Sequence, residues 1–97
     1  MPDRFEPLDV SRKRLAEDGV ARTIRRIGST WFRDGSAAPG FELVASLGAQ
    51  ASESAAQAGL DAMSRWDGRA ALAGLSMPAL VLWGDGDQSY RWPQVEA

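Results

Sequence analysis

A run of five apolar residues, ALVLW at 79–83, constrains the fold of this chain more than any other feature. Pro78 stands before the run and the turn sequence GDGD follows it, so residues that interrupt helices bound it on both sides. A strand that is apolar on both faces is typical of a sheet covered on both sides. We therefore predict one buried β-strand at about 79–83. A turn of buried helix is the alternative, because a short apolar run fits either structure.

The rest of the chain predicts helices and offers no second convincing strand. The expected helices cover residues 9–19, 20–33, 39–50, 52–66 and 67–74. Residues 41–44 are also compatible with a strand, which leaves that alternative open for the third helix. A buried strand needs neighbours for its backbone N–H and C=O groups. We therefore expect either that residues 79–83 pair with something outside this chain or that they are poorly ordered.

The clearest helix signal is an apolar stripe between residues 20 and 31. Its members recur at the helical spacing of three to four residues and are Val20, Ile24, Ile27 and Trp31. Arginines occupy the other side of the same helix. The stripe predicts a helix face that packs against a core.

Small polar residues and glycine mark the helix ends. Asp9 or Ser11 is expected to cap the first helix, and Gly19 to end it. Ser52 is expected to cap the fourth helix, and Asp67 the last short one. These signals divide the helical part of the chain into short segments.

Composition excludes several classes of function. The 97 residues contain no histidine and no cysteine, which removes imidazole bases, thiolate nucleophiles, disulfides and Cys- or His-based metal sites. The net charge of −2 argues against a nucleic-acid partner. No apolar run approaches the roughly 20 residues that cross a membrane, and the N-terminal MPDRFEPLDVSRKR lacks the apolar segment of a secretory signal. We expect a single cytoplasmic domain without a membrane partner.

The stretch LAGLSMPALVLWGDGDQSY, together with the overlapping AMSRWDGRAALAGL, resembles the α/β-hydrolase family. The shared pattern is a helix, an apolar linker, a proline, a buried strand and then G-x-x-D. The resemblance implies that residues 1–66 form a helical cap, or lid, and that residues 67–97 return to the α/β core. By family the fold class is thus α/β, and this chain would contribute four to five cap helices followed by one strand.

An α/β-hydrolase active site combines a nucleophile on a G-x-S-x-G elbow, an acid after a late strand, and a histidine. The resemblance assigns only the acid, to Asp87, which would hold the histidine in its tautomer and stabilise the imidazolium. The sequence GLSMP lacks the second glycine of an elbow, and its Ser76 precedes the predicted strand instead of following it. The resemblance thus implies a partial hydrolase of ester- or amide-type bonds. It would use no cofactor and would be inactive alone, because the rest of the hydrolase core is missing.

Five large side chains are candidates for an apolar substrate site between the cap and the core. They are Trp31, Phe32, Phe41, Met63 and Trp66. The substrate implied is a small molecule that is apolar in part. Each of the five side chains also suits ordinary packing, and that alternative stays open.

Three other interpretations of the sequence remain. Asp87 also suits an ordinary turn residue after a strand. A calcium loop is suggested by Asp85, Asp87, Ser89 and Glu96, which fall at positions 1, 3, 5 and 12 of an EF-hand-like loop, but Tyr90 stands where that loop needs glycine. We therefore expect no metal. The third interpretation is a small, non-catalytic helical protein-interaction module whose apolar stripe binds a partner.

Overall fold

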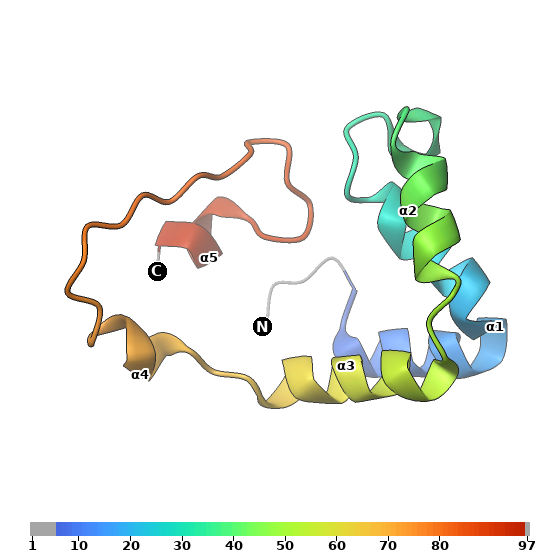
Figure 1. Ribbon diagram of the computed structural model, residues 1–97, viewed down its shortest axis with the longest axis horizontal. Coiled ribbons are helices and arrows are strands. Elements are labelled where there is room, and N and C mark those ends of the chain that lie inside the picture. Colours follow the sequence, from blue (N-terminus) through green and yellow to red (C-terminus); the bar gives the residue numbers. More distant parts are fainter. Residues whose placement is uncertain (1–5, 97) are drawn as a thin grey trace.

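The computed structural model describes residues 6–96, and every regular element in that range is a helix (Figure 1). The elements are α1 (Leu8–Ser29), a short 3₁₀ helix η1 (Gly35–Ala37), α2 (Phe41–Gly48), α3 (Glu53–Arg65), α4 (Arg69–Leu72) and α5 (Trp92–Glu96). α1 packs against η1, α2 and α3, and these elements form a helical unit. None of the helices in the described range has the length and apolar character needed to cross a bilayer.

α1 bends sharply at Gly19, whose backbone dihedrals are φ 78° and ψ 170°. This conformation is essentially restricted to glycine, since a side chain there would strain the backbone. The predicted helix end at Gly19 is confirmed, because residues before and after it form two separate arms. The predicted cap is wrong: the helix begins at Leu8, and Pro7 occupies the cap position without a side-chain hydrogen bond.

Glu6 bridges the two arms of α1. Ser11 lies inside the helix as one of its hydrogen-bond partners, and not at the cap position. Ser11 is buried in the first arm and donates a hydrogen bond of 2.8 Å to Glu6 Oε2. Arg26, in the second arm, donates from Nη1 to both carboxylate oxygens of Glu6 at 2.8 Å. Arg14 Nη1 lies 3.4 Å from Glu6 Oε1. The carboxylate therefore holds the bend from its inner side.

α2 packs on the second arm of α1 and supplies the largest core residue. Phe41 is only 1% exposed and forms a T-shaped contact with Phe32, with ring centroids 6.4 Å apart and an interplanar angle of 86°. A Cβ atom at Gly48 would lie 2.3 Å from Ile24 Cγ1, so glycine permits the close approach of α2 to α1. The helix predicted for this segment is confirmed, and the strand alternative is wrong.

α3 packs on the first arm of α1. The Ser52 hydroxyl accepts a hydrogen bond of 3.1 Å from the Ala55 N–H, which confirms its predicted role as the cap. An ion pair of 2.6 Å joins Arg12 of α1 to Asp61 of α3. The predicted cap of α4 is wrong: Gly68 occupies the cap position without a side-chain hydrogen bond, although Asp67 before it accepts a hydrogen bond of 3.1 Å from the Arg69 N–H.

After α3 the chain leaves the helical unit and runs in a wide arc before it returns (Figure 1). α4 and α5 pack against none of the other described helices. The radius of gyration is 15.2 Å, whereas a compact chain of similar length has about 13 Å. The C-terminal third is therefore an open extension of the helical unit.

The predicted buried strand is wrong. Within residues 6–96 there is no strand, and the run 79–83 is non-helical chain without a pairing segment. Leu80 is 84% exposed and Leu82 is 86% exposed. The reason is that a strand obtains its backbone hydrogen bonds from a neighbouring strand, and the described residues supply none. The α/β architecture expected from the family resemblance is therefore not the architecture of this chain, which is helical.

Candidate functional site

An apolar cavity of about 500 Å³ lies between α1 and α3. Val20, Ile24 and Ile27 line it from the second arm of α1, and Leu60 and Met63 line it from α3. Ser89 and Tyr90, which the returning chain carries, complete its lining. Three segments that are far apart in the sequence therefore share one concave site.

The apolar stripe seen in the sequence is the wall that α1 contributes to this cavity. All four stripe residues, Val20, Ile24, Ile27 and Trp31, are among its lining residues. Trp31 remains more than half exposed. The periodicity thus identified the correct helix face, although that face borders a cavity instead of a filled core.

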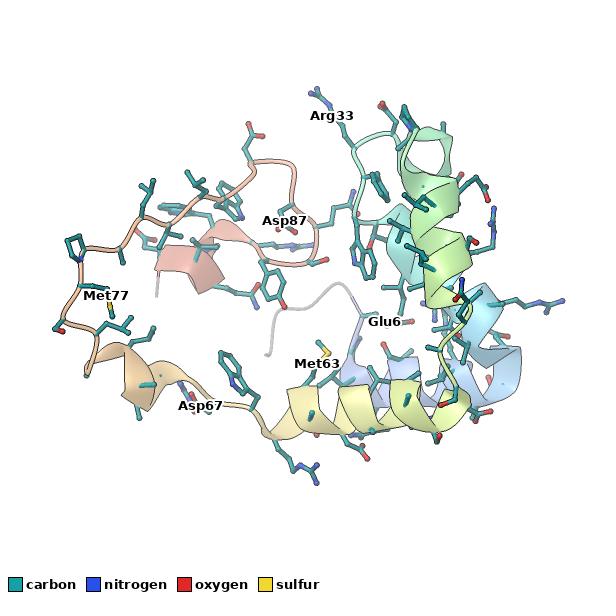
Figure 2. All side chains as sticks on the ribbon, in the orientation of Figure 1. Glu6, Arg33, Met63, Asp67, Met77 and Asp87 are labelled. Carbon is teal, nitrogen blue, oxygen red and sulfur yellow. The ribbon has the colours of Figure 1, made fainter. Side chains whose placement is uncertain are left out.

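The five candidate substrate-binding residues occupy different environments. Trp31 and Met63 line the cavity, and Figure 2 shows Met63 pointing from α3 towards the interior of the fold. Phe41 is core, and Phe32 packs against its ring. Trp66, just beyond α3, is 70% exposed. The structure therefore brings two of the five candidates to one site.

Glu6 is the charged residue of the cavity lining, and its charge is already compensated. Its side chain is 11% exposed and faces Arg26 and Arg14. Burial acts to raise the pKa of Glu6, but hydrogen bonds from Arg26 and Ser11 and the two arginine charges outweigh burial and lower this pKa. Glu6 is therefore held ionised and paired.

Sequence reasoning missed three polar residues of the cavity, Glu6, Thr23 and Thr30. Thr23 lies three residues after Val20, so the helical spacing of the stripe could have included it. It is 7% exposed, and within residues 6–96 its hydroxyl oxygen has no hydrogen-bond partner. Glu6 carries no comparable signal, because it lies outside the periodic segment that forms the wall.

Asp87 organises the turn that faces the cavity (Figure 2). Its Oδ1 atom accepts hydrogen bonds from the Ser89 N–H at 2.7 Å and the Tyr90 N–H at 3.0 Å. Its own N–H donates to the Gly84 carbonyl at 3.0 Å. In the described range no side-chain or backbone group donates to Oδ2. One oxygen thus fixes the turn while the other is available to a further donor.

Two tryptophans close the base of this turn. Trp83 Nε1 donates a hydrogen bond of 2.6 Å to the Tyr90 carbonyl, and the Trp83 and Trp92 rings lie 5.4 Å apart. Trp83 belongs to the run predicted to be a buried strand, but it is only half-buried, and its ring packs on Trp92 at the surface. The pair nevertheless gives the Asp87 turn a defined shape.

The calcium interpretation finds no geometric support in the described part of the chain. There, no three side chains of the Asp, Glu, His or Cys type gather in a way that could hold a metal ion. Asp85 and Glu96 therefore do not join Asp87 in a shared site.

Comparisons with protein-family models, with curated proteins and with solved structures find no match to this chain.

Proposed function

We propose that this chain is the cap and the acid-bearing part of an enzyme that resembles α/β-hydrolases. The enzyme would hydrolyse an ester- or amide-type bond in a small, partly apolar substrate. One observation carries this proposal: Ser89 and Tyr90, which bind the Asp87 carboxylate, line the same cavity as Trp31 and Met63. The candidate acid thus stands beside a site of suitable size for a small molecule.

The chemistry assigned to Asp87 uses its second carboxylate oxygen. Oδ2 would accept a hydrogen bond from the Nδ1–H of a histidine, whose Nε2 would take the proton of the nucleophile. The 97 residues contain no histidine, so this base and the activated nucleophile must come from other residues. The enzyme would be cytoplasmic and would need no cofactor, nucleic acid or membrane.

The exposed apolar run supports the proposal of a missing hydrolase core. Four consecutive residues, ALVL at 79–82, are exposed, and an exposed apolar run of this kind marks a surface that another protein segment covers. It lies directly before the Asp87 turn. The remainder of the enzyme would therefore approach the turn from the side of this run.

Replacing Asp87 tests this function in the longest open reading frame that contains these residues. Asp87→Asn is expected to lower kcat for p-nitrophenyl esters about 10⁴-fold, because the histidine loses its tautomer and its counter-charge. Asp85→Asn, in the same turn, is the matched control and should leave kcat within about threefold. The isolated 97 residues should give no turnover above buffer. Equal rates for the two variants, or turnover by the isolated chain, would contradict the assignment.

A non-catalytic protein-interaction module is the second candidate function. The observation in its favour is the same exposed run, since Leu80 and Leu82 are almost fully exposed. The two candidate functions predict different effects of a substitution at Asp87. If this chain were an interaction module only, Asp87→Asn would leave its function unchanged, whereas a double Leu80→Ser, Leu82→Ser variant would abolish partner binding.

A further inference from the structure

The composition of the cavity wall restricts what the cavity can bind. A volume of about 500 Å³ falls within the range of about 300–1,000 Å³ that is typical of small-molecule sites. Aliphatic side chains from α1 and α3 dominate the lining, with Ile24, Ile27 and Leu60 among them. Most of the surface of a bound molecule would therefore meet apolar atoms, so its body must be apolar as well.

The charges around the cavity disfavour a charged ligand. The lining contains no lysine or arginine among the described residues, so it offers no partner for a carboxylate or a phosphate. Glu6 is the charged member of the lining, and Arg26 and Arg14 already compensate it. A ligand cation would find its counter-charge occupied. Because burying an unpaired charge costs several kcal/mol, an uncharged ligand is favoured.

Thr23 supplies a second, independent indication of a ligand. It lines the cavity and is more than nine-tenths buried, and its hydroxyl oxygen has no partner in the described range. This oxygen is shielded from solvent. Threonine in a helix has two accessible χ1 rotamers, so a rotation can present the hydroxyl to a ligand. A ligand oxygen would then satisfy a group that is otherwise buried without a hydrogen bond.

We propose that this cavity binds an uncharged, mostly apolar small molecule, one oxygen of which accepts a hydrogen bond from the Thr23 hydroxyl. An ester with an aliphatic acyl chain fits this description, and the choice of an ester, unlike the binding itself, rests on the proposed hydrolase function. The Asp87 turn then forms the rim of the cavity through Ser89 and Tyr90. Binding needs only residues of this chain, so the isolated chain can be tested.

The test is a fluorescence titration of the 97-residue chain with N-phenyl-1-naphthylamine, an uncharged apolar probe. We expect saturable binding of one probe per chain. Methyl decanoate should displace the probe, and decanoate, which has the same chain length but carries a charge, should be weaker by more than about tenfold. Displacement by decanoate at equal or lower concentration would overturn the inference.

One matched pair of variants and one double variant locate the site of probe binding. Ala56→Phe fills the cavity from α3 and should weaken probe binding by about tenfold or more, whereas Ala58→Phe, on the exposed face of the same helix, should not. Equal effects of the two would overturn the inference. A Leu80→Ser, Leu82→Ser variant needs no change in the helical unit and should retain binding. Loss of binding in that variant would place the probe on the exposed run and would also overturn the inference.

A separate displacement measurement tests the role of Thr23. Thr23→Val keeps the shape of the side chain, so probe binding should persist while displacement by methyl decanoate weakens about threefold to tenfold, the value of one hydrogen bond. An unchanged methyl decanoate affinity would remove Thr23 from the site. Because none of these measurements involves turnover, a failure of the hydrolase proposal would leave their results unaffected. If the probe did not bind, the Asp87→Asn experiment would still test the hydrolase proposal.

Discussion

Gly19 sets the angle between the two arms of α1, and through it the position of the cavity wall. Its φ of 78° lies where a Cβ atom strains the backbone, although the space around it is open. Glu6 secures the same bend by side-chain contacts to Ser11 and Arg26. One residue thus permits the bend and another holds it, and each can be tested separately.

Substituting two helix glycines that lie in open space, Gly19 and Gly59, should change stability in opposite directions. Gly19→Ala should lower the free energy of unfolding by about 1–3 kcal/mol because of backbone strain. Gly59→Ala lies inside α3 with nothing within 4 Å of the added Cβ, and should raise it by about 0.5–1 kcal/mol. Urea unfolding followed by circular dichroism measures both. A neutral Gly19→Ala variant would show that the bend does not need glycine.

Glu6 should make stability depend on pH. Because the folded-state pKa of Glu6 lies below its ordinary value of 4.5, its contribution is complete above that value and is lost as the pH falls through the folded-state pKa. Glu6→Gln should therefore lower the free energy of unfolding at pH 7 by about 1–2 kcal/mol. The variant should also lose less stability than the wild type between pH 5 and pH 3, roughly the range in which carboxylates titrate. Parallel pH profiles for the two proteins would contradict this role.

At the scale of elements, the sequence allowed the helices to be predicted much better than the run at 79–83. The Ser52 cap, the break at Gly19 and the stripe on α1 depend on neighbours within a few residues, so local patterns were sufficient. A strand depends on a partner segment that a local pattern does not contain. The cavity was predictable in part, since the stripe marked its wall, but Glu6 and the Asp87 turn reach it only through tertiary contacts.

Hydrogen exchange of the isolated chain should distinguish the packed helices α1 and α3 from the apolar run at 79–83. Amides in α1 and α3 should be protected because their hydrogen bonds lie within packed helices. Amides of residues 79–83 should exchange at the rate of an unfolded chain, since they are exposed and unpaired in this structure. Protection at 79–83 comparable with α3 would show that the run is ordered by contacts that this structure does not contain.

At the scale of the whole molecule, the chain combines a packed helical unit with an extension that returns to it. The extension leaves after α3, and its turn at Asp87 comes back to line the cavity through Ser89 and Tyr90. This return places the candidate acid beside the candidate ligand site. The proposed function depends on it more than on any single side chain.

Paramagnetic relaxation enhancement measures this return most directly. The chain has no cysteine, so Gln88→Cys, in the Asp87 turn, provides a single site for a nitroxide label. We predict strong broadening of the methyl signals of Ile24 and Leu60 in the cavity wall, and little broadening when the label is placed at Ala73→Cys, beyond α4. Undiminished Ile24 and Leu60 signals with the label at position 88 would show that the turn does not border the cavity, and would contradict the account.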